Sequence, residues 1–115
     1  MIPPRWIRAF QDIKTHCQYI LEDTREATQE TFSNDRQMRQ LVERNLEIIG
    51  IAAIVIRQEN PDILDDVEDL HQAIGLRNRL AHGYDEEINK DILWETIQVS
   101  VPNLLVETDR ILESY

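Results

Sequence analysis

The apolar run Ile48-Ile49-Gly50-Ile51-Ala52-Ala53-Ile54-Val55-Ile56 is the stretch that decides the fold. It continues a helical period that starts near Met38, with apolar residues recurring three or four positions apart. A helix that is apolar on nearly every face is buried, either at the centre of a core or against another chain. The sequence therefore predicts an all-α fold built around this helix.

Three small residues in this run, Gly50, Ala52 and Ala53, would let a neighbouring helix approach closely. That neighbour is either a helix of a second chain or another helix of the same chain. In so small a domain we favour the second chain slightly, and we keep packing within the chain as the alternative.

Amphipathic segments flank the apolar helix on its N-terminal side. Pro3 and Pro4 suit the start of a helix, since proline is tolerated in the first turn. An apolar stripe follows at spacings of three and four: Trp6, Phe10, Ile13, Cys17 and Ile20. We expect this helix to end before Phe32, and Ser33 or Asn34 to cap the next one.

On the C-terminal side, Pro61 should end the apolar helix. A third helix is expected from about residue 62 or 65 to residue 81, and a fourth from about Asn89, kinked or split by Pro102. No strand alternation or internal repeat is visible in the sequence. The expected fold is an up-and-down bundle of four or five helices, in one domain spanning residues 1–115.

The composition narrows the class of protein. With 115 residues and 42% hydrophobic content, the chain can form a stable hydrophobic core without disulfides or a structural metal. A single cysteine, Cys17, excludes an internal disulfide, and no apolar run approaches the roughly 18 residues that span a membrane. We expect a reduced, cytoplasmic setting, with no cofactor and no membrane partner.

The net charge of −10 argues against a general nucleic-acid binder and against binding to anionic membranes. The basic residues are nevertheless unusual, because ten of the twelve are arginine. Arginine is preferred over lysine in paired and phosphate-binding sites. A cleft on which several arginines converge would carry a local potential opposite to that of the whole chain.

An acidic cluster precedes the third helix: Asp62, Asp65, Asp66, Glu68 and Asp69. Carboxylates at these spacings could hold a divalent metal, which would make the chain a metal-dependent helical enzyme. Acidic residues also favour the positive end of a helix dipole, and most charge runs are solvated. We therefore rank the metal hypothesis well below the others and expect no metal.

The densest chemistry lies in Gly75-Leu76-Arg77-Asn78-Arg79-Leu80-Ala81-His82-Gly83-Tyr84. Arg77 and His82 are five positions apart, which would place them on different faces of one straight helix. They can meet if the helix ends here, with Gly83 just past its end. The dipole would then favour a protonated His82, beside an arginine fork that suits a phosphate. The plainer alternative is that these residues only cap the helix.

The pattern Arg-Asn, with four residues between the Arg and a following His-x-Tyr, resembles the signature of the HEPN superfamily, most closely its HepT-like branch. The likeness covers roughly residues 35 to 112 and extends to three further segments: Asp35-Arg36 with Arg44 to Gly50, Gly75 to Asn78, and Asp91 to Glu95 with Pro102 and Leu104. The sequence departs from the family at Ile51, where a Glu is frequent, and at residues 63–67, where a Pro-Trp pair is frequent.

The resemblance implies a HEPN-like homodimer, or a larger homo-oligomer, that acts as a metal-independent endoribonuclease. Such proteins are toxins of type VII-like toxin–antitoxin systems, paired with a minimal nucleotidyltransferase antitoxin. Carried over to this chain, Arg77 and His82 are catalytic and Asn78 and Arg79 support them. Tyr84 is then the residue to which the antitoxin attaches AMP. The other hypothesis is a non-catalytic helical adaptor that binds a nucleotide or a protein partner.

Overall fold

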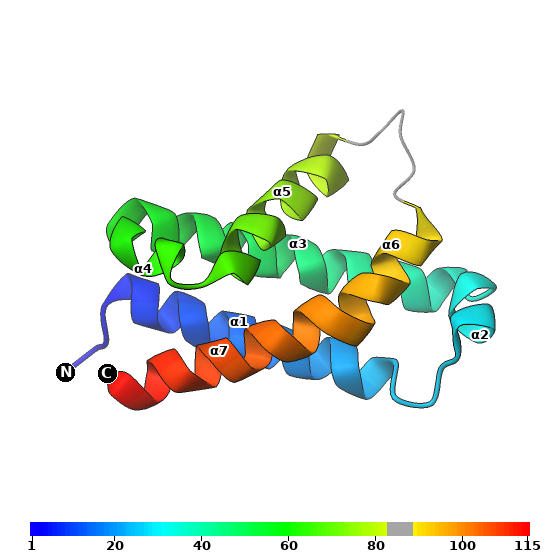
Figure 1. Ribbon diagram of the computed structural model, residues 1–115, viewed down its shortest axis with the longest axis horizontal. Helices are drawn as coiled ribbons and strands as arrows, with labels where there is room; N and C mark the ends of the chain where they lie inside the picture. The colour runs from blue at the N-terminus through cyan, green and yellow to red at the C-terminus, as the bar shows by residue number, and fades with distance from the viewer. Residues whose placement is uncertain (83–88) are drawn as a thin grey trace.

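The computed structural model describes residues 1–82 and 89–115, and describes His82 through its backbone alone. Four long helical segments run alternately in opposite directions, so that both termini lie at the same end of the bundle (Figure 1). They are α1 (Arg5–Asp23), α3 (Arg36–Glu59), α5 (Glu68–His82), and the continuous segment α6 (Lys90–Glu95), η1 (Thr96–Ser100) and α7 (Val101–Ser114). The expected all-α up-and-down bundle is confirmed.

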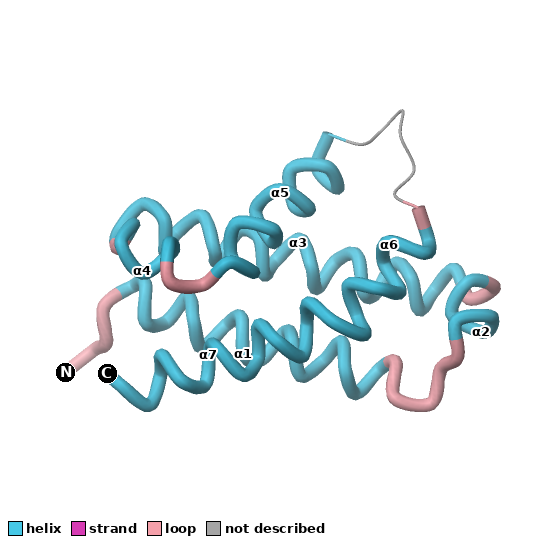
Figure 2. The backbone as a smooth tube through the Cα atoms, in the orientation of Figure 1, coloured by secondary structure: helices cyan, strands magenta, loops and turns pink. Residues whose placement is uncertain are grey.

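Short helices α2 (Gln29–Ser33) and α4 (Pro61–Asp65) lie in the connections between the long segments. Figure 2 shows how little of the described chain is loop. None of the described helices has the length and apolarity needed to cross a membrane.

The core forms where the apolar stripe of α1 meets α3 and α7. Phe10, Ile13, Cys17 and Ile20 have no exposed surface, as the spacing of the stripe predicts. Fully burying one such Phe or Ile side chain stabilises the fold by about 1.5–3 kcal/mol. This stripe therefore fixes which face of α1 turns inward.

Helix α3 is the central element, because it packs against both α1 and α5. Gly50, Ala52 and Ala53 are buried inside the chain, at 7% exposure or less for the two alanines. The preference for a second chain at these three positions is therefore wrong, and packing within the chain is what the structure shows. Small side chains here let α5 and α1 approach α3 closely.

Helix ends differ from the sequence prediction at several places. The cap of α3 is Asp35, whose side-chain oxygen accepts a hydrogen bond from the backbone nitrogen of Met38 at 3.0 Å. Neither Ser33 nor Asn34 takes that role, because Ser33 belongs to α2 and Asn34 is the C-cap residue of α2. Capping by a carboxylate satisfies one free N–H group of the first turn.

The third predicted helix is divided in two, since α4 ends at Asp65 and α5 begins at Glu68. Val67, 1% exposed, sits in the break and packs into the core. Pro102 has the expected effect: the regular helix gives way to the wider turn η1 just before it. A proline nitrogen cannot donate to the preceding turn, so the hydrogen-bond pattern changes there.

Candidate functional site

The C-terminal half of α5 carries Arg77, Asn78 and Arg79, the described part of the motif. Successive residues of a helix turn by about 100°, so these three point in different directions. Arg77 faces α3 and is half-buried, whereas Asn78 and Arg79 are exposed. Arg77 is therefore packed against α3, whereas Arg79 is exposed on another face of the same helix.

Arg77 rests on Gly50 of α3. A Cβ atom added at Gly50 would collide with Cβ of Arg77, would lie 2.7 Å from its Cγ, and would lie 2.9 Å from the carbonyl oxygen of Ala73. Only a glycine leaves room for the stem of Arg77 at this crossing. The apolar helix of the sequence analysis therefore positions the motif arginine.

The guanidinium of Arg77 is only partly satisfied. Its Nη1 donates a hydrogen bond to Oδ1 of Asn78 at 3.3 Å, and its buried Nε has no hydrogen-bond partner among the residues that the structure describes. A buried donor without a partner is costly, by about 1–3 kcal/mol. The part of this guanidinium that a ligand could contact is its Nη1 side, where the hydrogen bond to Asn78 is exposed, and a guanidinium there suits an oxyanion. Asn78 steadies the guanidinium in this arrangement.

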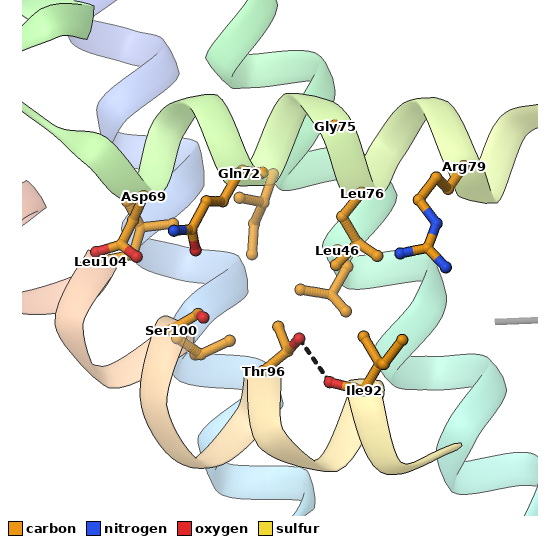
Figure 3. A pocket seen from close by; sticks show the side chains of 13 residues that line it. Leu46, Asp69, Gln72, Gly75, Leu76, Arg79, Ile92, Thr96, Ser100 and Leu104 are labelled. Atoms are coloured by element: carbon orange, nitrogen blue, oxygen red, sulfur yellow. Dashed lines mark hydrogen bonds between the residues drawn. The ribbon is translucent and has the colours of Figure 1, made fainter. Parts of the chain in front are cut away.

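A groove that the sequence did not predict lies between α5 and the segment α6–η1–α7. It has a volume of about 370 Å³. Asp69 lies at one end and Arg79 at the other, as Figure 3 shows, with Gln72 and Leu76 between them on the same helix. Its other lining residues, mostly apolar, are Leu46, Ile49, Ala73, Gly75, Ile92, Thr96, Ser100, Val101 and Leu104.

Polar groups inside the groove are few. Thr96 donates its hydroxyl hydrogen to the carbonyl oxygen of Ile92 at 2.8 Å, which leaves the rim largely apolar (Figure 3). Burial, with smaller contributions from Glu107 and then Glu68, raises the pKa of Asp69 above its ordinary value. Burial and the two neighbouring carboxylates therefore disfavour the ionised form of Asp69.

The acidic cluster does not assemble into a metal site. Among the described side chains, no group of three or more His, Cys, Asp or Glu residues is placed to hold a metal ion. Asp65 instead lies 3.6 Å from Nε2 of His71, and both of these side chains are largely solvated. Asp62 lies in the first turn of α4, and Glu68 and Asp69 lie in the first turn of α5, where the helix dipole favours acidic side chains.

Two of the predicted site residues fall beyond what the structure describes. The side chain of His82 and all of Tyr84 lie outside the described residues. Helix α5 does extend to His82, one residue beyond the expected end. The meeting of Arg77 with His82 stays a prediction, as does any role for Tyr84.

The family match and the similar proteins all point to the same family of ribonucleases. The profile of the Ribonuclease HepT-like family matches residues 13–111 of the chain, which include the motif. A protein of Thermococcus cleftensis called "Probable ribonuclease HepT" is 32% identical, over 82% of this chain and 84% of its own. A candidate RNase of Methanocaldococcus jannaschii is 31% identical over 91% and 95% of the two chains. Another, from Caldanaerobacter subterraneus subsp. tengcongensis, is 29% identical over 90% of each. None of the solved structures matches the chain significantly.

Proposed function

Because this chain belongs to the HepT-like ribonuclease family, we propose that it is a metal-independent endoribonuclease and the toxin of a type VII-like toxin–antitoxin pair. The observation that carries the proposal is the half-buried Arg77, held on Gly50 with its Nη1 at an exposed hydrogen bond to Asn78. A phosphodiester oxygen of RNA is the anion that this guanidinium would bind. The proposal places the protein in the cytoplasm with its substrate.

Cleavage would proceed by attack of a ribose 2′-oxygen on the adjacent phosphorus. His82 takes the proton of the 2′-hydroxyl or returns a proton to the departing 5′-oxygen. Arg77 stabilises the charge on the phosphorus-bound oxygens, with Asn78 fixing its guanidinium. The bond from phosphorus to the 5′-oxygen breaks, which leaves a 2′,3′-cyclic phosphate and a 5′-hydroxyl without any oxidation or reduction.

A complete site would combine two copies of the chain. One copy offers a single His82, whereas the reaction uses both a base and an acid. A two-fold dimer would supply the second imidazole and would bring Arg77 and Arg79 of both copies into one cleft. That concentration of arginine would oppose the overall charge of −10 where RNA has to bind.

Tyr84 is the proposed point of control. In this scheme its phenol oxygen attacks the α-phosphorus of ATP, held by a minimal nucleotidyltransferase antitoxin, and pyrophosphate leaves. The attached AMP adds negative charge two residues from His82, which would repel the phosphates of RNA. Incubation with the cognate transferase and ATP, followed by mass spectrometry, tests this step, with Tyr84→Phe as the control. An unmodified Tyr84 would remove it.

RNA cleavage assays with matched variants test the catalytic proposal. Arg77→Ala and His82→Ala are expected to lower the cleavage rate by about 10²-fold or more. Arg57→Ala and His71→Ala are the controls, because each removes an exposed residue of the same type outside the motif. Equal cleavage by all five proteins, wild type included, would refute the roles of Arg77 and His82.

The adaptor hypothesis keeps one observation in its favour, the net charge of −10. An adaptor would bind its nucleotide or protein partner without cutting RNA. It would therefore tolerate His82→Ala with no loss of growth inhibition or of partner binding. Loss of growth inhibition in that variant, with its fold intact, supports the ribonuclease instead.

A further inference from the structure

Three polar side chains of the groove between α5 and α6–η1–α7 lie toward the end away from the motif. Asp69 and Gln72 project from α5, and Ser100, the last residue of η1, lies across the groove from them (Figure 3). None of these three side chains forms a hydrogen bond with another residue of the described chain. A carboxylate, an amide and a hydroxyl are therefore open to a ligand at one end of a mainly apolar groove.

The other end of the groove carries Arg79. This exposed guanidinium forms no ion pair with any residue that the structure describes, and arginine is well suited to bind a phosphate. Asp69 and Arg79 are ten residues apart on α5, which is about 15 Å along the helix axis. That separation is comparable with the length of one extended nucleotide. The groove volume, about 370 Å³, lies in the range of about 300–1,000 Å³ that is usual for small-molecule sites.

We propose that the groove holds one guanine nucleotide of the RNA substrate, with a phosphate at Arg79 and the edge of the base at Asp69 and Gln72. These two residues of α5 would then select the nucleotide beside which the RNA is cut. The inference rests on the proposed function, because it names the base that the same RNA-cutting site prefers.

The choice of guanine follows from the hydrogen bonds that each base offers. A carboxylate accepts hydrogen bonds and donates none. Guanine has two adjacent donors, N1–H and the 2-amino group, which match the two oxygens of Asp69, and its O6 accepts from the amide of Gln72. Adenine and cytosine have an acceptor nitrogen beside their amino group, and uracil has a carbonyl on each side of its N3–H. Each of these three bases would set a lone pair against the carboxylate.

The surroundings of Asp69 and the walls of the groove agree with this occupant. Burial, and then Glu107 and Glu68, raise the pKa of Asp69, so the ionised form would gain from two N–H donors. Between the two ends, Leu76 and Ile92 provide apolar surface for the faces of the base, and Ile92 is 38% exposed. Unpaired bases of RNA are commonly recognised in this way, by packing on their faces and hydrogen bonding at their edges.

The first test measures nucleotide binding by isothermal titration calorimetry, with guanosine 5′-monophosphate and inosine 5′-monophosphate as the probes. Inosine lacks only the 2-amino group, so the wild type should bind the guanosine nucleotide at least about tenfold more tightly. Asp69→Asn should bring this ratio close to one, because an amide has a single acceptor oxygen. Asp62→Asn makes the same change at an exposed position outside the groove and should keep the wild-type ratio.

The second test measures base preference in RNA cleavage. Oligonucleotides that carry each of the four bases at one position, with the cuts mapped by sequencing, should be cut at least about tenfold faster beside guanine. Gln72→Ala should reduce this preference and Asp69→Asn should abolish it, whereas Gln18→Ala, an exposed change on α1, should retain it. Partial unfolding lowers all the rates together and leaves the preference unchanged, so the ratio separates base recognition from a structural effect.

The outcomes separate this inference from the proposed function. Equal affinity of the wild type for the two nucleotides, or an Asp69→Asn variant that keeps the wild-type preference, would overturn the guanine pocket. RNA cleavage without any preference for guanine would leave the ribonuclease standing without this pocket. Binding of guanosine 5′-monophosphate that responds to the variants as expected, in a protein that cuts no RNA, would keep the pocket and refute the ribonuclease.

Discussion

Replacing Gly50 with alanine tests the contact that anchors the motif arginine. The new methyl group would collide with Cβ of Arg77 and lie 2.9 Å from the carbonyl oxygen of Ala73. Both of those atoms are fixed to the backbone of α5, so no change of rotamer relieves the clash. Helix α5 has to move away from α3 instead.

The magnitude follows from two opposing terms. Overpacking of this kind costs about 1–3 kcal/mol. Alanine in place of glycine recovers about 0.5–1 kcal/mol in a helix. We therefore expect Gly50→Ala to lower the free energy of unfolding by roughly 1–2 kcal/mol, which lowers the melting temperature by about 4–8 °C in a domain of this size.

Urea unfolding and thermal melts followed by circular dichroism measure this loss. Gly75→Ala is the matched control on the neighbouring helix, because nothing lies within 4 Å of its Cβ position. At concentrations where the chain sediments as a monomer, this control should gain about 0.5–1 kcal/mol. The two glycines are thus expected to respond with opposite signs.

The reasoning fails if Gly50→Ala is as stable as the wild type. That result would mean that α3 and α5 are not in contact at Arg77, and that the arginine is not held where we describe it. A folded Gly50→Ala protein is also expected to cleave RNA more slowly, since its guanidinium has moved. Unchanged cleavage would separate the packing contact from the chemistry.

Three further predictions concern single residues. Asp35→Ala should lower the free energy of unfolding by about 1 kcal/mol because α3 loses its N-cap, whereas Ser33→Ala should have little effect. Urea unfolding measures both variants, and equal losses would contradict the assignment of Asp35 as the cap. Thr108→Val should raise the free energy of unfolding by about 1 kcal/mol, because the buried Thr108 hydroxyl oxygen has no hydrogen-bond partner in the described part of the chain. A less stable variant would show that it has one. Burial, with a smaller contribution from Asp69, raises the pKa of Cys17 to about 12 from an ordinary value of 9.0. The stability from the neutral thiol is therefore full below about pH 9 and is lost as the pH rises toward 12, and native Cys17 should resist alkylation that labels it rapidly in urea.

The motif shows how far sequence alone could reach at the site. The run from Gly75 to Tyr84 could be found by its chemistry, and the family that it indicated is confirmed by the profile match. The packing of Arg77 on Gly50 and the groove beside Arg79 could not be predicted from the motif. Both depend on residues distant in the chain, and no local pattern records which glycine meets which arginine.

The same distinction between what local sequence predicts and what distant contacts decide holds for the fold. The sequence alone determined that the chain is all-α and which residues of α1 face the core, since both follow from the spacing of apolar residues. It also determined that Pro102 disrupts the last helix, since proline lacks an amide donor. Only the tertiary structure decided that Asp35 caps α3, that Val67 divides α4 from α5, and that the small residues of α3 pack within the chain. The break at Val67 and the packing of the small residues depend on which helix lies opposite, because tertiary contacts set the space that is left to each side chain. The choice of Asp35 over Ser33 and Asn34 depends instead on where the short helix α2 ends.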